Sequence, residues 1–189
     1  SGVMNSFYRE TLKQWPALTG DWQADFETAA LHVYDCLVRF PGIAAYMVVH
    51  NRFRMAQLVR DGETDYGVLL FERFVGVIRE AGFDAHMTGM YGALLMEFIV
   101  SGAFATVRHR WPGDQGDFLN KVFDSLSPAQ FPNTHFVRKG HFQQISGSTW
   151  FKDGLRLVLN GLGLERSRLP ALASETSKPA RPGRRASKA

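Results

Sequence analysis

The chain has 189 residues, of which 45% are hydrophobic and 21% charged, a composition typical of a soluble globular protein and sufficient for one domain with a sizeable core. Its single cysteine, Cys36, excludes an internal disulfide and indicates a reducing, cytoplasmic setting. The net charge of +4 comes from the end of the chain, where residues 166–189 carry seven Lys or Arg against one acid. Residues 1–165 have a net charge of −2 and no basic stripe for a nucleic-acid backbone.

Apolar residues recur at helical spacing along almost the whole chain, and no segment alternates with the period of a strand. The sequence therefore predicts an all-α fold, a helical bundle of about seven to eight helices. Asp21 and Asp84 are expected N-caps, and Pro41-Gly42 and Gly82 are expected helix ends. The expected helices cover residues 3–15, 22–40, 43–59, 64–81, 87–107, 115–126, a short segment from 133, and 149–164.

The segment 87–107 is the most apolar part of the chain and is long enough to cross a bilayer. Glu97 at its centre is unfavourable in a membrane, so we expect a core helix buried on two sides and no membrane partner. Glu97 could be an acid with a raised pKa, a ligand anchor or, as we favour, the partner of an arginine. One face of large residues should pack on the core, and a flatter opposite face should need a partner. The first face holds Tyr91, Leu94, Leu95 and Phe98, and the second holds Gly89, Ala93, Met96, Val100, Ala103 and Val107.

The sequence contains no recognisable catalytic or metal-binding motif. The six histidines have no HxxxH or HExxH spacing, Cys36 has no CxxC partner, and the serines lie in no GxSxG setting. A glycine-rich phosphate loop is also missing. We therefore predict no enzyme activity, no catalytic residues, no metal and no cofactor.

Several local motifs follow one another in a characteristic order over residues 4–164. In chain order they are Gly20-Asp21-Trp22, Phe40-Pro41-Gly42, Glu80-Ala81-Gly82-Phe83, Leu126-Ser127-Pro128-Ala129-Gln130-Phe131-Pro132-Asn133, Phe151-Lys152-Asp153-Gly154-Leu155 and Leu159-Asn160-Gly161-Leu162. Their order and spacing resemble the C-terminal ligand-binding and dimerisation domain of TetR-type transcriptional regulators. We accordingly divide the chain into such a domain, residues 1–165, and a basic tail, residues 166–189. The composition of the tail predicts disorder, with a weak, salt-sensitive nucleic-acid contact as the alternative.

The resemblance implies a homodimer that forms an intersubunit four-helix bundle, and a hydrophobic small-molecule effector bound among the helices. His50 is either a ligand contact or an ordinary histidine. The expected interface residues are Ala93, Met96, Val100, Ala103, Val107, Phe151, Leu155, Val158 and Leu162. The expected ligand-binding residues are Phe7, Thr11, Val33, Leu37, Met47, His50, Phe71, Phe74, Tyr91, Leu95 and Phe98.

Members of this family carry a three-helix DNA-binding unit before the helix that begins here near Met4. We therefore expect operator DNA to be bound only through an N-terminal domain that this chain lacks. A bound effector would shift the first helix and change the separation of two DNA readers. The alternative is a natural relative without the helix-turn-helix that binds a ligand or forms a heterodimer, and an enzyme is a third class.

Overall fold

The structure is a computed structural model that describes residues 2–50, 56 and 59–169. All regular elements within these residues are helical, which confirms the predicted all-α fold. In chain order they are α1 (Gly2–Lys13), α2 (Trp22–Arg39), α3 (Pro41–Val49), α4 (Tyr66–Glu80), α5 (Ala85–Val107), the 3₁₀ turn η1 (Pro112–Gln115), α6 (Gly116–Ser125), α7 (Pro132–Lys139), the 3₁₀ turn η2 (Phe142–Gln144) and α8 (Gly147–Arg168).

Local capping chemistry sets most of the helix ends. Asp21 accepts two backbone N–H groups from the first turn of α2, and Asp84 accepts one from α5 at 2.8 Å, as the sequence predicts. Gly82, with φ +84°, follows α4 in the left-handed conformation that favours glycine. Asp65 and Ser146 cap α4 and α8 in the same way, although the sequence analysis had not singled them out.

Two helices end away from their predicted positions. Helix α3 ends at Val49, well before the predicted end at residue 59, and residues 51–55, 57 and 58 lie outside the described residues. Helix α8 continues to Arg168, so Arg166 and Arg168, which we had assigned to the basic tail, belong to its last turn. Cationic side chains are favourable at that end of a helix. Residues 170–189 lie outside the described residues.

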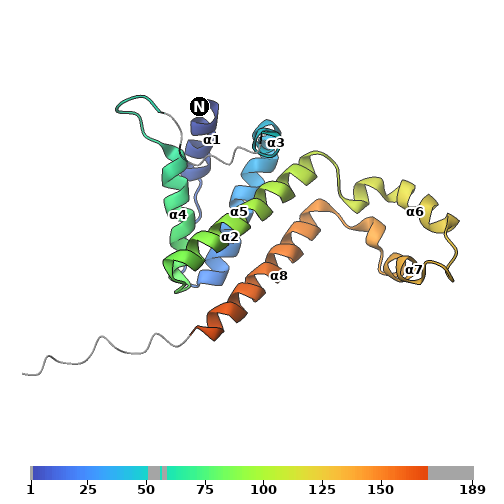
Figure 1. Cartoon of the computed structure of the whole chain (residues 1–189). Helices are drawn as coiled ribbons and strands as arrows, with labels where there is room; N and C mark the ends of the chain where they lie inside the picture. The colour runs from blue at the N-terminus through green and yellow to red at the C-terminus, as the bar shows by residue number, and fades with distance from the viewer. Residues whose placement is uncertain (1, 51–55, 57–58, 170–189) are drawn as a thin grey trace, which may run out of the picture.

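The apolar helix α5 is the central element and packs against α2, α3, α4 and α8 (Figure 1). By length and composition alone it could cross a membrane. Its side chains nevertheless form the protein core, because Leu95, Ile99 and Ala103 are buried by the neighbouring helices. Burial on several sides explains why the segment is apolar almost all round. Glu97 is exposed and accepts a hydrogen bond from the Ser101 hydroxyl at 3.0 Å, and it forms no ion pair with a described arginine.

The predicted partner face requires correction, because three of its six residues, Met96, Val100 and Ala103, are buried within the chain itself. Leu94, predicted in the core, is instead 61% exposed. A helix that is apolar all round carries no sequence signal for the side that meets its own neighbours, so each of the two predicted faces contains both buried and exposed residues. Of the predicted interface residues, Met96, Val100, Ala103, Phe151, Leu155 and Leu162 are buried, Val107 and Val158 are half-buried, and Ala93 is exposed.

Helices α5 and α8 approach closely at Gly102. Phe151 of α8 is fully buried at this point and stacks on Tyr34 of α2, with ring centroids 3.8 Å apart. A Cβ atom on Gly102 would lie 2.8 Å from Cδ2 of Phe151, closer than such atoms approach in proteins. Gly102 thereby lets one aromatic side chain from α8 reach α2 across α5.

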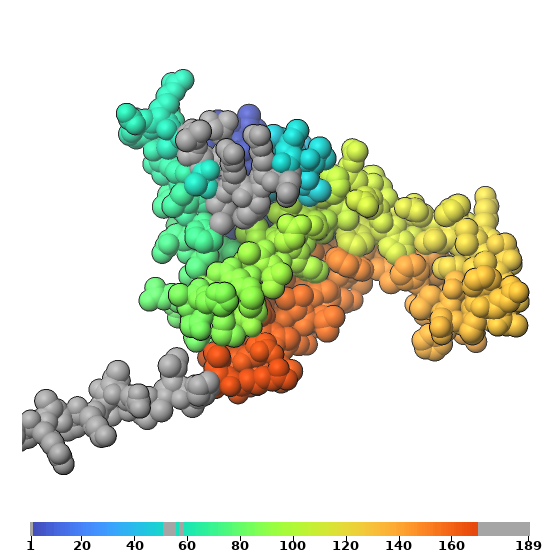
Figure 2. All heavy atoms as spheres, viewed as in Figure 1, coloured from blue at the N-terminus to red at the C-terminus, as the bar shows by residue number. Residues whose placement is uncertain are grey.

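Residues 112–144 form a projection between the end of α5 and the start of α8 (Figures 1 and 2). Its elements pack mainly against one another. At its base, the Gly113 N–H donates to the Ile145 carbonyl at 2.9 Å, and the Trp111 indole donates to the Thr106 hydroxyl at 2.8 Å. The projection is therefore attached through one end of the α5–α8 pair.

Replacing Gly102 with Val should lower the free energy of unfolding by about 2 kcal/mol, because Phe151 cannot move without losing its stack on Tyr34. Gly76→Ala is the matched control, since a Cβ there meets no atom within 4 Å. The control should gain about 0.5–1 kcal/mol from helix propensity. Urea unfolding measures the free energy of unfolding of both variants. A G102V variant as stable as the unmodified protein would contradict the close approach of α5 and α8 at Gly102.

The turn between α1 and α2 depends on a buried carboxylate. Asp25 accepts the Thr19 backbone N–H at 2.6 Å, the Thr19 hydroxyl at 2.8 Å and the Gly20 N–H at 2.8 Å. These hydrogen bonds, that from the Thr19 N–H foremost, hold the pKa of Asp25 below its usual value despite burial. The ionised carboxylate thus fixes the turn that joins α1 to α2.

The contribution of Asp25 to stability should depend on pH. A depressed folded-state pKa stabilises the protein above the unfolded-state pKa of about 3.9, and this stabilisation is lost as the pH falls through the folded-state value. Asp25→Asn should therefore reduce the urea midpoint at pH 7, and the difference from the unmodified protein should narrow at pH 3. The exposed Asp61, changed to Asn, is the control. A difference that stays the same at both pH values would refute this role.

Candidate ligand-binding site

Four of the eleven predicted ligand-binding residues line an interior space where α1 to α5 meet. Four further residues that the sequence analysis had not assigned to a pocket share it. The space measures about 10 Å³, which is at most room for one water molecule. Its lining is Phe7, Tyr8, Val33, Leu37, Met47, Leu70, Met96 and Val100.

The other seven predicted ligand-binding residues lie elsewhere. Thr11, Phe74 and Leu95 are buried in the surrounding core. His50 is exposed at the C-terminal end of α3 with its ring against Tyr46, and Phe71 is exposed on α4. Tyr91 packs against Phe83, and Phe98 stacks on Trp150 and Phe151 of α8. Sequence spacing locates these residues on their helices but does not reveal which neighbour each one faces.

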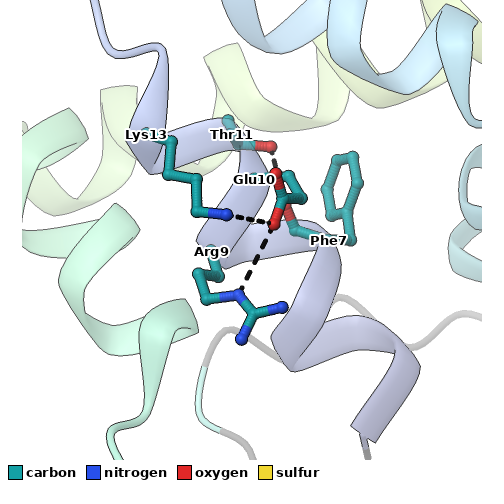
Figure 3. A network of polar contacts seen from close by, with 5 residues as sticks. All are labelled: Phe7, Arg9, Glu10, Thr11 and Lys13. Carbon is teal, nitrogen blue, oxygen red and sulfur yellow. Dashed lines mark hydrogen bonds and ion pairs between the residues drawn. The ribbon is translucent and has the colours of Figure 1, made fainter.

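Helix α1 separates a charged outer side from an apolar inner side (Figure 3). Glu10 accepts a hydrogen bond from Lys13 at 2.8 Å and pairs with Arg9 at 3.5 Å. The Phe7 ring points away from these charges, and the Thr11 hydroxyl donates to the Phe7 carbonyl at 3.0 Å (Figure 3). Because the Thr11 hydroxyl is satisfied within its own helix, it is not an unpaired polar contact for a ligand.

A side-chain amide ties the start of α1 to the start of α4. The Asn5 Nδ2 donates to the Thr64 carbonyl at 3.0 Å, and the Tyr66 backbone N–H donates to the Asn5 Oδ1 at 2.9 Å. The N–H donor and the carbonyl acceptor of the Asn5 side chain therefore both form hydrogen bonds with the segment that begins α4. This contact couples α1 to α4 at the same end of the molecule.

A second and much larger space opens between α1, the end of α2 and the start of α3, and we call it the α1–α3 groove. Its volume is about 650 Å³, within the range of small-molecule sites. The Phe40 ring in its wall contacts Phe7 edge-on, with centroids 5.9 Å apart, so the groove adjoins the interior core. The lining residues are Val3, Met4, Arg39, Phe40, Pro41, Gly42, Ile43 and Tyr46.

The α1–α3 groove was not predicted from the sequence. The available signal was the basic residue Arg39 directly before the helix-breaking Phe40-Pro41-Gly42 sequence, which opens a gap between α2 and α3. Among the described residues, Arg39 is the only charged residue in the lining. Its Nη1 donates weakly to the Gln14 Oε1 at 3.4 Å, and no carboxylate of the described residues lies within ion-pair distance.

Cys36 and His32 form a contact on α2, with the thiol sulfur 3.9 Å from the His32 Nε2. Burial of Cys36 raises the pKa of its thiol. The hydrogen bond with His32 and the charge of His32 act in the opposite direction and outweigh burial, so the net shift of the pKa is downward. The same Nε2 lies 2.8 Å from the Thr11 carbonyl and must donate to it. Cys36 is buried, so a substrate cannot reach the thiol. Within the described ranges, His, Cys, Asp and Glu form no group of three that could hold a metal.

Comparison with known families identifies the origin of this architecture. The family described as tetracyclin repressor-like, C-terminal domain matches residues 16–166, most of the chain. The chain belongs to this TetR-type family. A solved structure, the transcriptional regulator SCO7222, a TetR from Streptomyces coelicolor, has the same fold with a TM-score of 0.63. The two chains are 18% identical, and the match covers 85% of this chain and 72% of that one. A comparison with curated proteins finds no match.

Membership in the TetR-type C-terminal family confirms the resemblance drawn from the local motifs. The matched range contains the helix that Asp21 caps, the Phe40-Pro41-Gly42 break and the last helix through Leu162. It also contains α5 and the helices α2, α3 and α4 that pack against it, whereas α1 lies before the matched range. This TetR-type domain is accordingly part of a regulator of transcription.

Proposed function

We propose that this TetR-type domain senses a hydrophobic small molecule, acts as a homodimer and relays ligand binding to a DNA-binding domain outside this chain. The observation that carries the proposal is the position of α1. Phe7 and Tyr8 line the interior space, and Val3 and Met4 line the α1–α3 groove. A molecule in either space would contact α1, and a difference in its affinity for two positions of α1 would shift their populations. The family setting supports a cytoplasmic regulator with no catalytic role.

The interior space supports sensing only through a change of shape. At about 10 Å³ it holds no organic molecule, although apolar side chains from five helices surround it. Two of these side chains, Met47 and Met96, are unbranched and can adopt other rotamers more easily than branched residues. A ligand that enters would separate α1 from α5, which is the type of displacement that a relay needs.

The dimer would use an exposed apolar face along α5 and α8. On α5, Met90 and Leu94 are exposed, and Leu94 lies one turn before Phe98, which packs over Gly154 of α8. On α8, Leu157 is 74% exposed one turn after Gly154, and Leu164 follows on the same side. The two exposed stripes therefore border the same α5–α8 seam. A second copy packing there would complete a four-helix bundle and remove the apolar stripes from water.

Leu157→Arg should convert the dimer into a monomer with little loss of fold, because a charge would be buried opposite its own symmetry mate. Leu69→Arg on α4 is the matched control, since Leu69 is also an exposed leucine. Sedimentation velocity at micromolar concentration measures both variants. If the L157R variant stays dimeric, the α5–α8 face is not the interface.

A thermal-shift screen with neutral aromatic and aliphatic alcohols should find molecules that raise the unfolding midpoint. Binding to the folded state at about 100 times Kd adds about 2.7 kcal/mol, or several degrees for a chain of this size. Hydrogen–deuterium exchange with the best molecule should then change in α1 and leave α6 and α7 unaffected. Exchange changes confined to α6 and α7 would exclude the proposed relay.

A further inference from the structure

The C-terminal end of α1 is joined to α2 by a histidine. The Nε2 of His32 lies 2.8 Å from the Thr11 carbonyl, and the His32 ring packs edge-on against Trp15 with centroids 6.0 Å apart. We propose that His32 is a pH-sensitive clamp, which holds the end of α1 against α2 when its imidazole is protonated and loosens that contact when the imidazole is neutral. The inference deepens the proposed relay through α1, and it rests on that relay for the consequence that pH regulates sensing.

The Thr11 carbonyl is a favourable site for a positive charge. It belongs to the last turn of α1, which ends at Lys13. Its partner in a continuing helix would be the Trp15 N–H, but this group donates instead to the Leu12 carbonyl at 3.2 Å. Carbonyl groups at a helix C-terminus lack partners in their own helix and form the negative end of the helix dipole. An imidazolium there donates a charge-assisted hydrogen bond, which is about twice as strong as a neutral one.

Protonation also fixes which nitrogen of His32 carries a hydrogen atom. An imidazolium has a hydrogen atom on both ring nitrogens, so its Nε2 always donates to the Thr11 carbonyl. The neutral ring has only one, and in the tautomer that carries it on Nδ1 the Nε2 lone pair would face the carbonyl oxygen. Deprotonation therefore admits a state of His32 that cannot hold α1.

The groups around the half-buried His32 favour its protonated form. The hydrogen bond with the Cys36 sulfur foremost, and then that with the Thr11 carbonyl, raise the pKa of His32 above its usual value, although partial burial opposes the change. The charge of Asp35, on the same helix, acts in the same direction. On the side of α1, the facing groups are the Thr11 carbonyl and the Trp15 ring, and both are uncharged.

The two neighbouring cations are engaged elsewhere. Lys13, at the end of α1, donates to Glu10 at 2.8 Å, and Arg39, further along α2, donates to the Gln14 amide oxygen at 3.4 Å. Among the described residues, Asp35 and Cys36 are the ionisable groups whose charges act on the pKa of His32. A positive charge on His32 therefore meets no opposing cation.

The clamp should hold on the acid side of neutrality. A group whose folded-state pKa is raised stabilises the fold fully below its unfolded-state pKa, about 6.5 for histidine, and this contribution is lost as the pH rises through the folded-state value. Helix α1 should accordingly be held more firmly at pH 5.5 than at pH 8. Because an interior ligand has to displace Phe7 and Tyr8 of the same helix, its affinity should be lower at pH 5.5.

The experiment measures hydrogen exchange of the α1 backbone amides at pH 5.5 and pH 8, as protection factors from which the intrinsic pH dependence of exchange is removed. His32→Gln keeps an N–H donor for the Thr11 carbonyl and removes the titration. His86→Gln, an exposed histidine in the first turn of α5, is the matched control. Cys36→Ala removes the neighbouring thiol and leaves the histidine. An NMR titration of the His32 imidazole in the unmodified chain records its protonation directly.

We expect the amides in the last two turns of α1 to be about fivefold better protected at pH 5.5 than at pH 8, the size typical of a cation at a helix C-terminus. H86Q and C36A should keep this ratio, and H32Q should remove the pH dependence. The His32 resonances should change over the same pH range as the protection of α1. Circular dichroism melts show that each variant is folded, and the NMR titration keeps the test decisive if H32Q is unstable.

Equal protection of α1 at both pH values in the unmodified chain, an unchanged pH dependence in H32Q, its loss in C36A, or a His32 titration outside the range in which protection changes would each overturn the clamp. Sensing is tested separately, by thermal shift with the neutral alcohols at both pH values. If the alcohols raise the unfolding midpoint and the protection of α1 does not depend on pH, only the clamp fails. If no alcohol raises the midpoint and α1 responds to pH through His32, the clamp holds and the sensing proposal fails. An equal midpoint shift at both pH values beside a pH-dependent α1 would contradict the relay through α1.

Discussion

The burial of α5 is the constraint on which the rest of the structure depends. A helix that is apolar almost all round is stable in water only when neighbours cover it on several sides. Helices α2, α3 and α4 supply one layer, and α8 supplies another after the chain returns from the projection. The packing around α5 is tight because Gly102 has no side chain. Phe151 can therefore extend across α5 and stack on Tyr34. What this cover leaves exposed, the stripes through Leu94 and Leu157, is the surface on which we propose that a second copy packs.

The contacts that attach α1 to the bundle are of a different kind, and they bear on the proposed relay through α1. Its inner face contributes Phe7 and Tyr8 to the core. Polar ties join it to the bundle at both ends, from Asn5 to the segment that starts α4 and from the Thr11 carbonyl to His32 of α2. The turn that follows α1 is fixed separately by Asp25. Because α1 is held at its two ends and bordered by both cavities, small changes in either cavity act on it directly. Dense cores transmit such changes instead of absorbing them.

Sequence reasoning succeeded where the signal is local. Asp21, Asp84 and Gly82 act within one helical turn, so their residue types predict helix ends without knowledge of the fold. It failed where the outcome depends on which helix arrives from elsewhere in the chain. Ala103 and Leu94 are both apolar residues on an apolar helix, and only the positions of the neighbouring helices decide that one is buried and the other exposed. Phe98 was expected at a ligand site for the same reason and instead packs on α8.

The proposed interior ligand must first separate side chains that already fill their space, so the binding-competent state is a minor one and the apparent affinity falls by its population. The side chains that such a ligand has to displace include Phe7 and Tyr8 of α1. The free energy needed to open the interior therefore depends on the position of α1. By linkage, a contact elsewhere in the protein that favours the displaced position of α1 would raise the affinity of the interior ligand, and the ligand would strengthen that contact by the same factor.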